Sequence, residues 1–130
     1  EMVQLLEKLH NWGITVGLFA FTPVRGTALE GRPPPKVGCY RRVQMAHFLI
    51  GKGFAEVEDF RFSPGGRIMG YGLAGELLRG ILAGGEAFET SGCPGCNRPY
   101  YNERPGGVMY NYPRPLSQAE IDQALAEAGV

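Results

Sequence analysis

The sequence lacks any hydrophobic run long enough to cross a membrane, and it lacks an excess of charge of either sign. No apolar stretch approaches the roughly 20 residues that a membrane-spanning helix needs, and no signal peptide is recognisable. Thirteen basic residues balance thirteen acidic ones, and no long basic run is present. The sequence therefore predicts no nucleic-acid partner and no membrane partner.

Cysteine and histidine are also scarce. The 130 residues include three cysteines and two histidines. An odd number of cysteines, two of them in a C-x-x-C pair, fits metal or redox chemistry in a reducing compartment better than a disulfide framework. We therefore expect a cytoplasmic protein. The length and the apolar content of 44% are those of one soluble globular domain or of part of one.

Three helical patterns alternate with three apolar segments of strand length. The helices are expected over about 2–11, 39–51 and 73–83, and the strands over about 14–21, 55–62 and 86–90. A nearly continuous apolar strand is typical of a parallel sheet that is buried on both faces. The order helix, strand, helix, strand predicts an α/β fold, either a doubly wound sheet or part of a (β/α) barrel.

The regular pattern stops after residue 96. Residues 97–115 are rich in Pro, Gly, Asn and Tyr and are expected to wrap over the domain without much regular structure. Ser117 and Glu120 form a capping box, which predicts a short helix to about Ala128. The tyrosines of this tail could stack on RNA bases, but the neutral charge and the proline spacing favour packing on the domain. They are Tyr100, Tyr101, Tyr110 and Tyr112.

Ligands of α/β sheets and barrels bind at the carboxyl ends of the strands. Three segments, 21–27, 60–63 and 90–96, follow the predicted strands and are expected to face one mouth. Arg25 could hold a carboxylate or phosphate there, or it could be a solvated loop arginine. Arg61 lies between two phenylalanines, so strand alternation points its side chain away from theirs, into a barrel interior. A buried guanidinium needs an anionic partner.

The most informative segment is T-S-G-C-P-G-C-N-R-P over residues 90–99. Cys93 and Cys96 can share a metal, close a redox disulfide or hold one side of an iron–sulfur cluster. A redox pair normally opens a helix, and the Asn-Arg-Pro that follows argues against one. An iron–sulfur cluster is favoured, with its remaining ligands outside this chain or from a side chain such as Ser91.

The competing interpretation of the pair is a structural zinc site. Such a site needs four ligands, and the other candidates are Cys39, His10 and His47. Both histidines fall on predicted helices, away from the expected mouth. Cys39 is interpreted as a free thiol in preference to a ligand.

Three further motifs carry a family resemblance. They are R-F-S-P-G-G-R at 61–67, L-A-G-G-E-A-F at 82–88 and P-V-R-G-T-A-L-E at 23–30. The first two resemble the last two β-strand units of biotin synthase, and the third resembles a loop after an inner strand of its barrel. The similarity covers about residues 1–92. It implies a radical S-adenosylmethionine (SAM) enzyme of TIM-type barrel fold, of which residues 1–92 would be the C-terminal part.

The tail differs from biotin synthase. Residues 90–103 and the Y-N-Y-P at 110–113 resemble biotin-synthase-like proteins, members of which act as a two-protein lipoyl synthase. This resemblance implies that residues 93–130 form an auxiliary-cluster-binding tail, with Cys93 and Cys96 as ligands of a [4Fe–4S] cluster that serves as the sulfur source. It also implies a partner radical SAM protein and a lipoyl carrier protein.

The resemblance assigns roles to the other candidate residues as well. SAM or substrate would be lined by Phe21, Thr22, Val24 and Arg25, whereas Arg61 and Ser63 would line the interior. The C-x-x-x-C-x-x-C motif of the SAM-cleaving cluster is absent from this sequence. Together with a start inside a helical pattern, this predicts the C-terminal fragment of a sulfur-insertion enzyme. The alternatives are a zinc-stabilised α/β binding module and a radical SAM enzyme with other chemistry.

Overall fold

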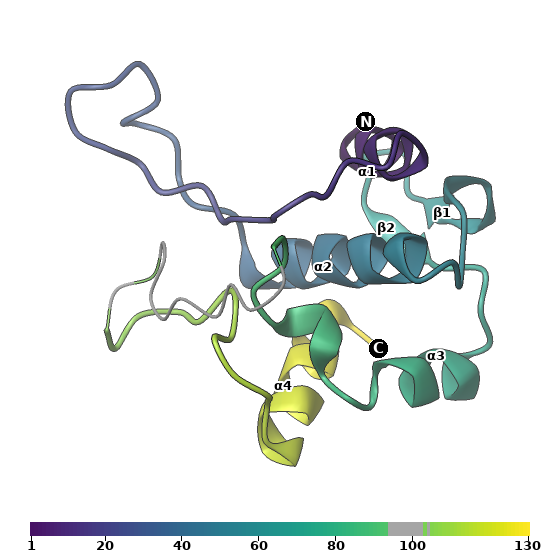
Figure 1. Ribbon diagram of the computed structural model, residues 1–130. Helices are drawn as coiled ribbons and strands as arrows, with labels where there is room; N and C mark the ends of the chain where they lie inside the picture. Colours follow the sequence, from purple (N-terminus) through teal and green to yellow (C-terminus); the bar gives the residue numbers. More distant parts are fainter. Residues whose placement is uncertain (94–102, 104) are drawn as a thin grey trace.

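The computed structural model describes residues 1–93, 103 and 105–130 of the chain. In it, helix α2 (Val37–Gly51) is central, with α1 (Met2–Asn11) against one side and α4 (Gln118–Ala128) against the other (Figure 1). The 3₁₀ turn η2 (Glu86–Phe88) packs on α2 next to α4. The described residues thus form a small mixed α/β domain built around one buried helix.

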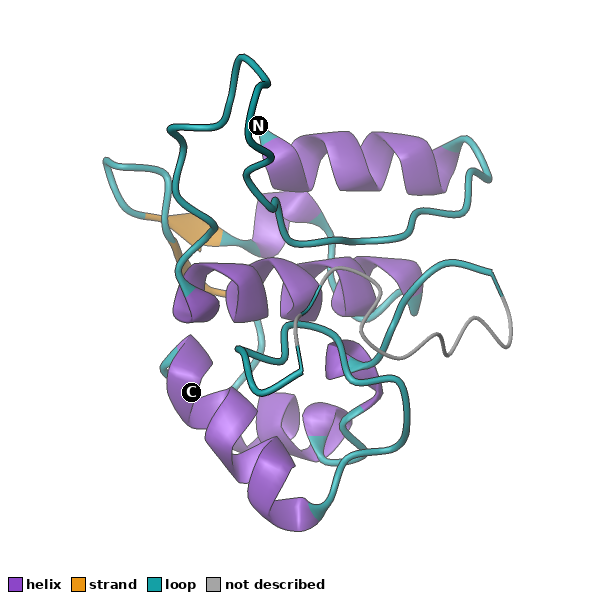
Figure 2. Cartoon of the chain, turned by 90° about the vertical axis from the view of Figure 1, so that its left-hand side faces the viewer, coloured by secondary structure: helices purple, strands orange, loops and turns teal. Residues whose placement is uncertain are grey.

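The remaining elements join these helices. They are the 3₁₀ turn η1 (Val57–Asp59), strands β1 (Arg61–Phe62) and β2 (Ile68–Gly70), and helix α3 (Gly75–Leu82). β1 and β2 pair antiparallel, with Arg61 opposite Gly70 and Phe62 opposite Ile68. Figure 2 shows this small hairpin at the edge of the helical body.

The helix predictions are confirmed to within a few residues. The first helix spans Met2–Asn11, and Gly13, with φ of 72°, donates its N–H to His10 at its end. The predicted capping box is present at α4, where Glu120 N–H donates to Ser117 Oγ and Ser117 N–H donates to Glu120. Arg114 binds the same carboxylate and, with Ser117, lowers the pKa of Glu120 to about 2.

The strand predictions are wrong for most of their length. Residues 14–21 are extended but belong to no strand ladder, and 55–62 divide into η1 and the two residues of β1. Residues 86–90 form η2 and one isolated parallel bridge, between Glu89 and Tyr112. The parallel sheet is therefore not formed within the described residues, because these apolar segments have no neighbouring strands to pair with there.

The core lies between α2, η2 and α4. Met45, Ala46, Leu49 and Phe88 are fully buried, and Ala124 is nearly so. Two tail tyrosines pack here as predicted: Tyr112 is buried, and Tyr110 donates its hydroxyl to Pro35 O (2.8 Å). Tyr100 and Tyr101 lie outside the described residues.

The long connection between α1 and α2 is packed very differently. It extends away from the helices on the left of Figure 1. Its exposed apolar side chains are Ile14, Phe19, Phe21, Val24 and Leu29. Among the described residues, no helix is long and apolar enough to cross a membrane.

Candidate functional site: a cavity at the cysteine segment

A cavity of about 700 Å³ opens where the first half of the chain meets the start of the cysteine segment. Its walls are the end of α1, the extended residues 13–16, the last turn of α2 and residues 86–93. Residues 13–16, where the apolar run begins, and residues 90–93, where the cysteine segment begins, both line this space.

Two predicted site residues lie at the cavity, Ser91 and Cys93. Cys93 carries an exposed free thiol on the wall, where reagents and ligands can reach it. Ser91, two residues earlier, accepts a hydrogen bond at Oγ from the N–H of Leu18 (2.9 Å). The other predicted ligand, Cys96, lies outside the described residues.

Two histidines share this cavity, although the sequence placed both away from the mouth. His10 comes from the last turn of α1 and His47 from α2. Burial lowers the pKa of His47, and the neighbouring His10 lowers it further. A neutral imidazole with a free lone pair can bind a metal or accept a proton. No pattern in the sequence indicates this pairing, because it depends on how α1 crosses α2.

The opposite side of the cavity is acidic. Glu86 pairs with Lys52 (2.7 Å) at the exposed rim. Burial raises the pKa of the Glu89 carboxyl, and the nearby Glu86 raises it further. Among the residues that the structure describes, no group of three or more His, Cys, Asp or Glu side chains could hold a metal ion. Any cluster or zinc ion would therefore need ligands beyond this set.

The loop after residue 20 does not reach the cavity. Phe21, Thr22, Val24 and Arg25 are exposed, and none of them lines it. The loop is closed locally by the N–H of Gly26, which donates to Glu30 (2.6 Å). The role of these side chains in binding SAM or substrate remains a prediction.

Arg61 and Ser63 are also placed elsewhere. Arg61 is exposed on β1 and lines a separate cavity of about 400 Å³ next to β2. Ser63 closes the hairpin, since its Oγ accepts the N–H of Arg67 (3.1 Å). The expected common mouth of the three segments is not formed by the described residues, because these strands do not lie side by side in one sheet.

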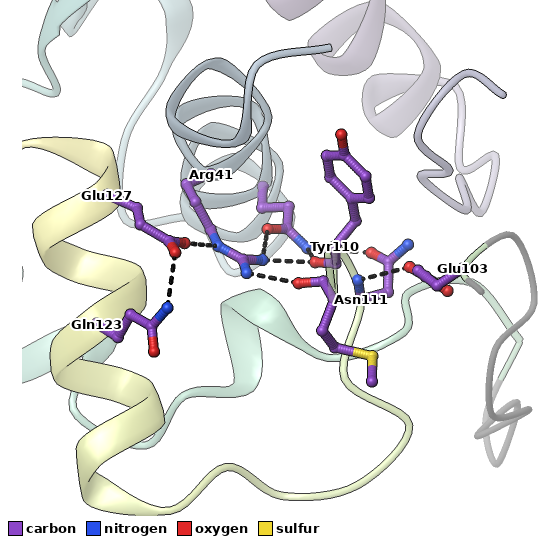
Figure 3. Close-up of polar contacts among 8 residues, drawn as sticks. Arg41, Glu103, Tyr110, Asn111, Gln123 and Glu127 are labelled. Atoms are coloured by element: carbon purple, nitrogen blue, oxygen red, sulfur yellow. Dashed lines mark hydrogen bonds and ion pairs between the residues drawn. The ribbon is translucent and has the colours of Figure 1, made fainter. Parts of the chain in front are cut away.

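The main polar feature that the sequence did not reveal is Arg41. Only 2% of this arginine is exposed, and its guanidinium reaches three elements (Figure 3). It binds Glu127 of α4 (2.9 Å), Gln44 of its own helix (2.9 Å) and the carbonyls of Met109 and Tyr110. The arginine therefore fixes the residues that follow the cysteine segment onto α2 and α4. No local pattern signals this role, because Arg42 and Gln44 are also buried on α2 and the partners of Arg41 in α4 and residues 109–110 lie far away in the sequence.

Comparisons with protein-family models, curated proteins and solved structures found no match to this chain.

Proposed function

We propose that this chain is the C-terminal part of a radical SAM sulfur-insertion enzyme, similar to lipoyl or biotin synthase, and that Cys93 and Cys96 bind an auxiliary [4Fe–4S] cluster. The observation that carries the proposal is the exposed, unpaired thiol of Cys93 on the wall of a large cavity, within a C-x-x-C pair. Thiolates are the usual protein ligands of such clusters. The proposed partners are a radical SAM protein and a lipoyl carrier protein.

The donor set fits an incomplete cluster site. Cys93 carries an exposed free thiol that can bind iron, and Cys96 follows at the spacing of a shared centre. The described residues supply no group of three ligands, so the proposal requires further ligands from another part of the protein. When bound, the cluster would supply sulfide to a substrate carbon radical generated with SAM elsewhere in the enzyme.

The extended residues 14–21 support a barrel in the whole protein. Within the described residues, no hydrogen bond reaches the backbone of Thr15, Val16 or Gly17. Unpaired backbone groups on an apolar segment are the edge that a neighbouring strand covers. In the proposed enzyme, residues 14–21 form a strand of the barrel, and the chain's part is to orient the reacting groups and exclude water.

Anaerobic reconstitution of the full chain with iron and sulfide tests the proposal. The expected result is a broad absorption near ~400 nm with bound iron and acid-labile sulfide. Cys93→Ser and Cys96→Ser should each lose most of this absorption. Cys39→Ser is the matched control, because Cys39 is an exposed free thiol on α2 outside the pair.

Stoichiometric zinc in a colourless protein would contradict the proposal and would support the zinc-stabilised binding module. Cluster formation that survives loss of both cysteines would contradict it too. The reaction type is tested separately, by product analysis on an octanoylated carrier protein with the intact enzyme. A methylthiolated or rearranged product would place the protein in another radical SAM class.

A further inference from the structure

Both backbone groups of Leu18 form hydrogen bonds, one with a residue before Cys93 and one with a residue after Cys96. Its N–H donates to Ser91 Oγ (2.9 Å), and its carbonyl accepts from Asn111 Nδ2 (3.3 Å). Ser91 lies two positions before Cys93, whereas Asn111 lies after the segment. Leu18 is therefore bonded to one residue that precedes the two cysteines and to another residue that follows them.

The side chain of Asn111 is oriented by its other contacts. It is buried, and its Oδ1 accepts from the Tyr40 hydroxyl (3.0 Å) and from Gln44 Nε2 (3.0 Å). With the oxygen occupied by two donors, the amide nitrogen is directed at the carbonyl of Leu18. The backbone N–H of Asn111 donates to Glu103 (2.9 Å). An amide provides both the donor and the acceptor that this position needs.

A short ladder aligns the two ends of the segment. Thr90 N–H donates to Tyr112 O (2.9 Å), and Tyr112 N–H donates to Phe88 O (2.9 Å). These bonds surround the isolated parallel bridge of Glu89 and Tyr112. Because the ladder lies directly beside Ser91 and Asn111, both side chains can reach Leu18 at once.

We propose that Ser91 and Asn111 are positioning residues, which tie the cysteine segment to Leu18 and thereby fix where Cys93 meets the cavity. Leu18 continues the extended run whose residues 14–16 form a cavity wall. The tie therefore sets the distance between this wall and the thiol. The effect of these two hydrogen bonds on cluster binding rests on the proposed function. The hydrogen bonds themselves can be measured in the chain without iron.

Two variants of the full chain test the tie. Asn111→Asp keeps an acceptor for Tyr40 and Gln44 but replaces the donor to Leu18 by an acceptor. Ser91→Ala removes the bond at the other end without adding charge near Glu103. Thr90→Val is the matched control, since Thr90 Oγ1 bonds Tyr112 O (3.4 Å) in the same ladder without contacting Leu18.

Two measurements on the apo chain read the tie directly. Amide exchange of Leu18, followed by NMR, should rise about fivefold to tenfold in Ser91→Ala, the effect of losing the one neutral hydrogen bond of this N–H. Asn111→Asp removes the bond at the Leu18 carbonyl instead, so the exchange should rise less in that variant. The rate at which iodoacetamide labels Cys93, read by peptide mass spectrometry, should change severalfold relative to the labelling rate of Cys39. Both readouts should stay at the wild-type value in Thr90→Val.

The control residue separates positioning from general loosening of the fold. A change confined to Leu18 and Cys93 supports the proposal, and in the iron-loaded chain it should be accompanied by weaker absorption near ~400 nm. Unchanged readouts, or an equal change at Cys39, would overturn it. If Asn111→Asp fails to fold, Ser91→Ala decides by the same criteria. A wild-type chain that binds no cluster would refute the proposed function alone.

Discussion

Two regions of the chain differ in which side chains they bury. In the packed region, formed by α2, η2, α4 and residues 109–112, even an arginine and a glutamine are buried, and each has several partners. In the open segment, residues 14–32, large apolar side chains such as Phe19 and Val24 stay exposed. Burial here depends on how many elements surround a residue more than on its hydrophobicity. Residues 14–21 of the open segment are nearly all apolar, and no layer of the described residues covers them.

The largest effect should come from removing the central charge of the packed region. Arg41→Met leaves Glu127 and the carbonyls of Met109 and Tyr110 without their donor. We expect a loss of about 4 kcal/mol in the free energy of unfolding, because breaking a buried ion pair leaves its partners uncompensated. Urea denaturation measures it.

Arg32→Met in the open segment is the matched control for this change. Arg32 is exposed, so its loss should shift the unfolding free energy by no more than about 0.5 kcal/mol. Equal effects of the two substitutions would show that the described packing around Arg41 does not exist in solution.

A pair of leucines sharpens the comparison for apolar side chains. Leu49 is fully buried in α2, whereas Leu29 is 51% exposed in the open segment. Leu49→Ala should cost about 3 kcal/mol through lost contacts and a cavity, and Leu29→Ala no more than about 0.5 kcal/mol. A large cost at Leu29 in the isolated chain would mean that the open segment is covered in solution, for instance by a second copy.

The helix caps differ between the two halves of the molecule. Ser117 caps α4 through its side chain, whereas Glu1, the N-cap residue of α1, makes no side-chain cap bond. Ser117→Ala should lower the stability by about 1 kcal/mol. Ser117→Asp keeps an acceptor for the Glu120 N–H and should retain most of it. Thermal melts followed by circular dichroism check both variants, and an unchanged melting temperature in Ser117→Ala would contradict the cap.

The smallest effect concerns the cavity wall at His47. Because burial and His10 lower its pKa, the folded chain keeps this imidazole neutral at a pH where the unfolded chain, with a pKa near ~6.5, binds a proton. Stability should therefore fall as the pH drops from about 6.5 toward the lowered pKa. His47→Gln should lose less stability over this window. Melting temperatures at several pH values measure the difference, and parallel curves would contradict the lowered pKa.

The features that could be predicted from the sequence are those that depend on residues close together along the chain. Helix periodicity and the capping box at Ser117 placed α1, α2 and α4 within a few residues of their observed ends. The strands could not be predicted in the same way, since an apolar run such as 14–21 becomes a strand only where another strand pairs with it. The burial of Arg41 and the meeting of His10 with His47 likewise depend on helix crossings that no local pattern encodes.

For the candidate site, the sequence directed attention to Ser91 and Cys93, and the structure places both on the wall of one cavity; their roles stay predictions. The sequence did not predict that Leu18 would contact both Ser91 and Asn111, residues far apart in the sequence. Such a contact requires the whole path of the chain between them. The roles of Phe21 to Arg25, Arg61 and Ser63 are still predictions.

The ion pair between Arg41 and Glu127 also constrains the chain while it is being made. The two residues are 86 positions apart, and a ribosome adds about 5–20 residues per second. For several seconds after its synthesis, α2 therefore carries an arginine and an apolar face whose partners do not yet exist. During that interval the nascent chain is exposed to aggregation, and a chaperone that shields α2 until α4 emerges would raise the yield of folded protein.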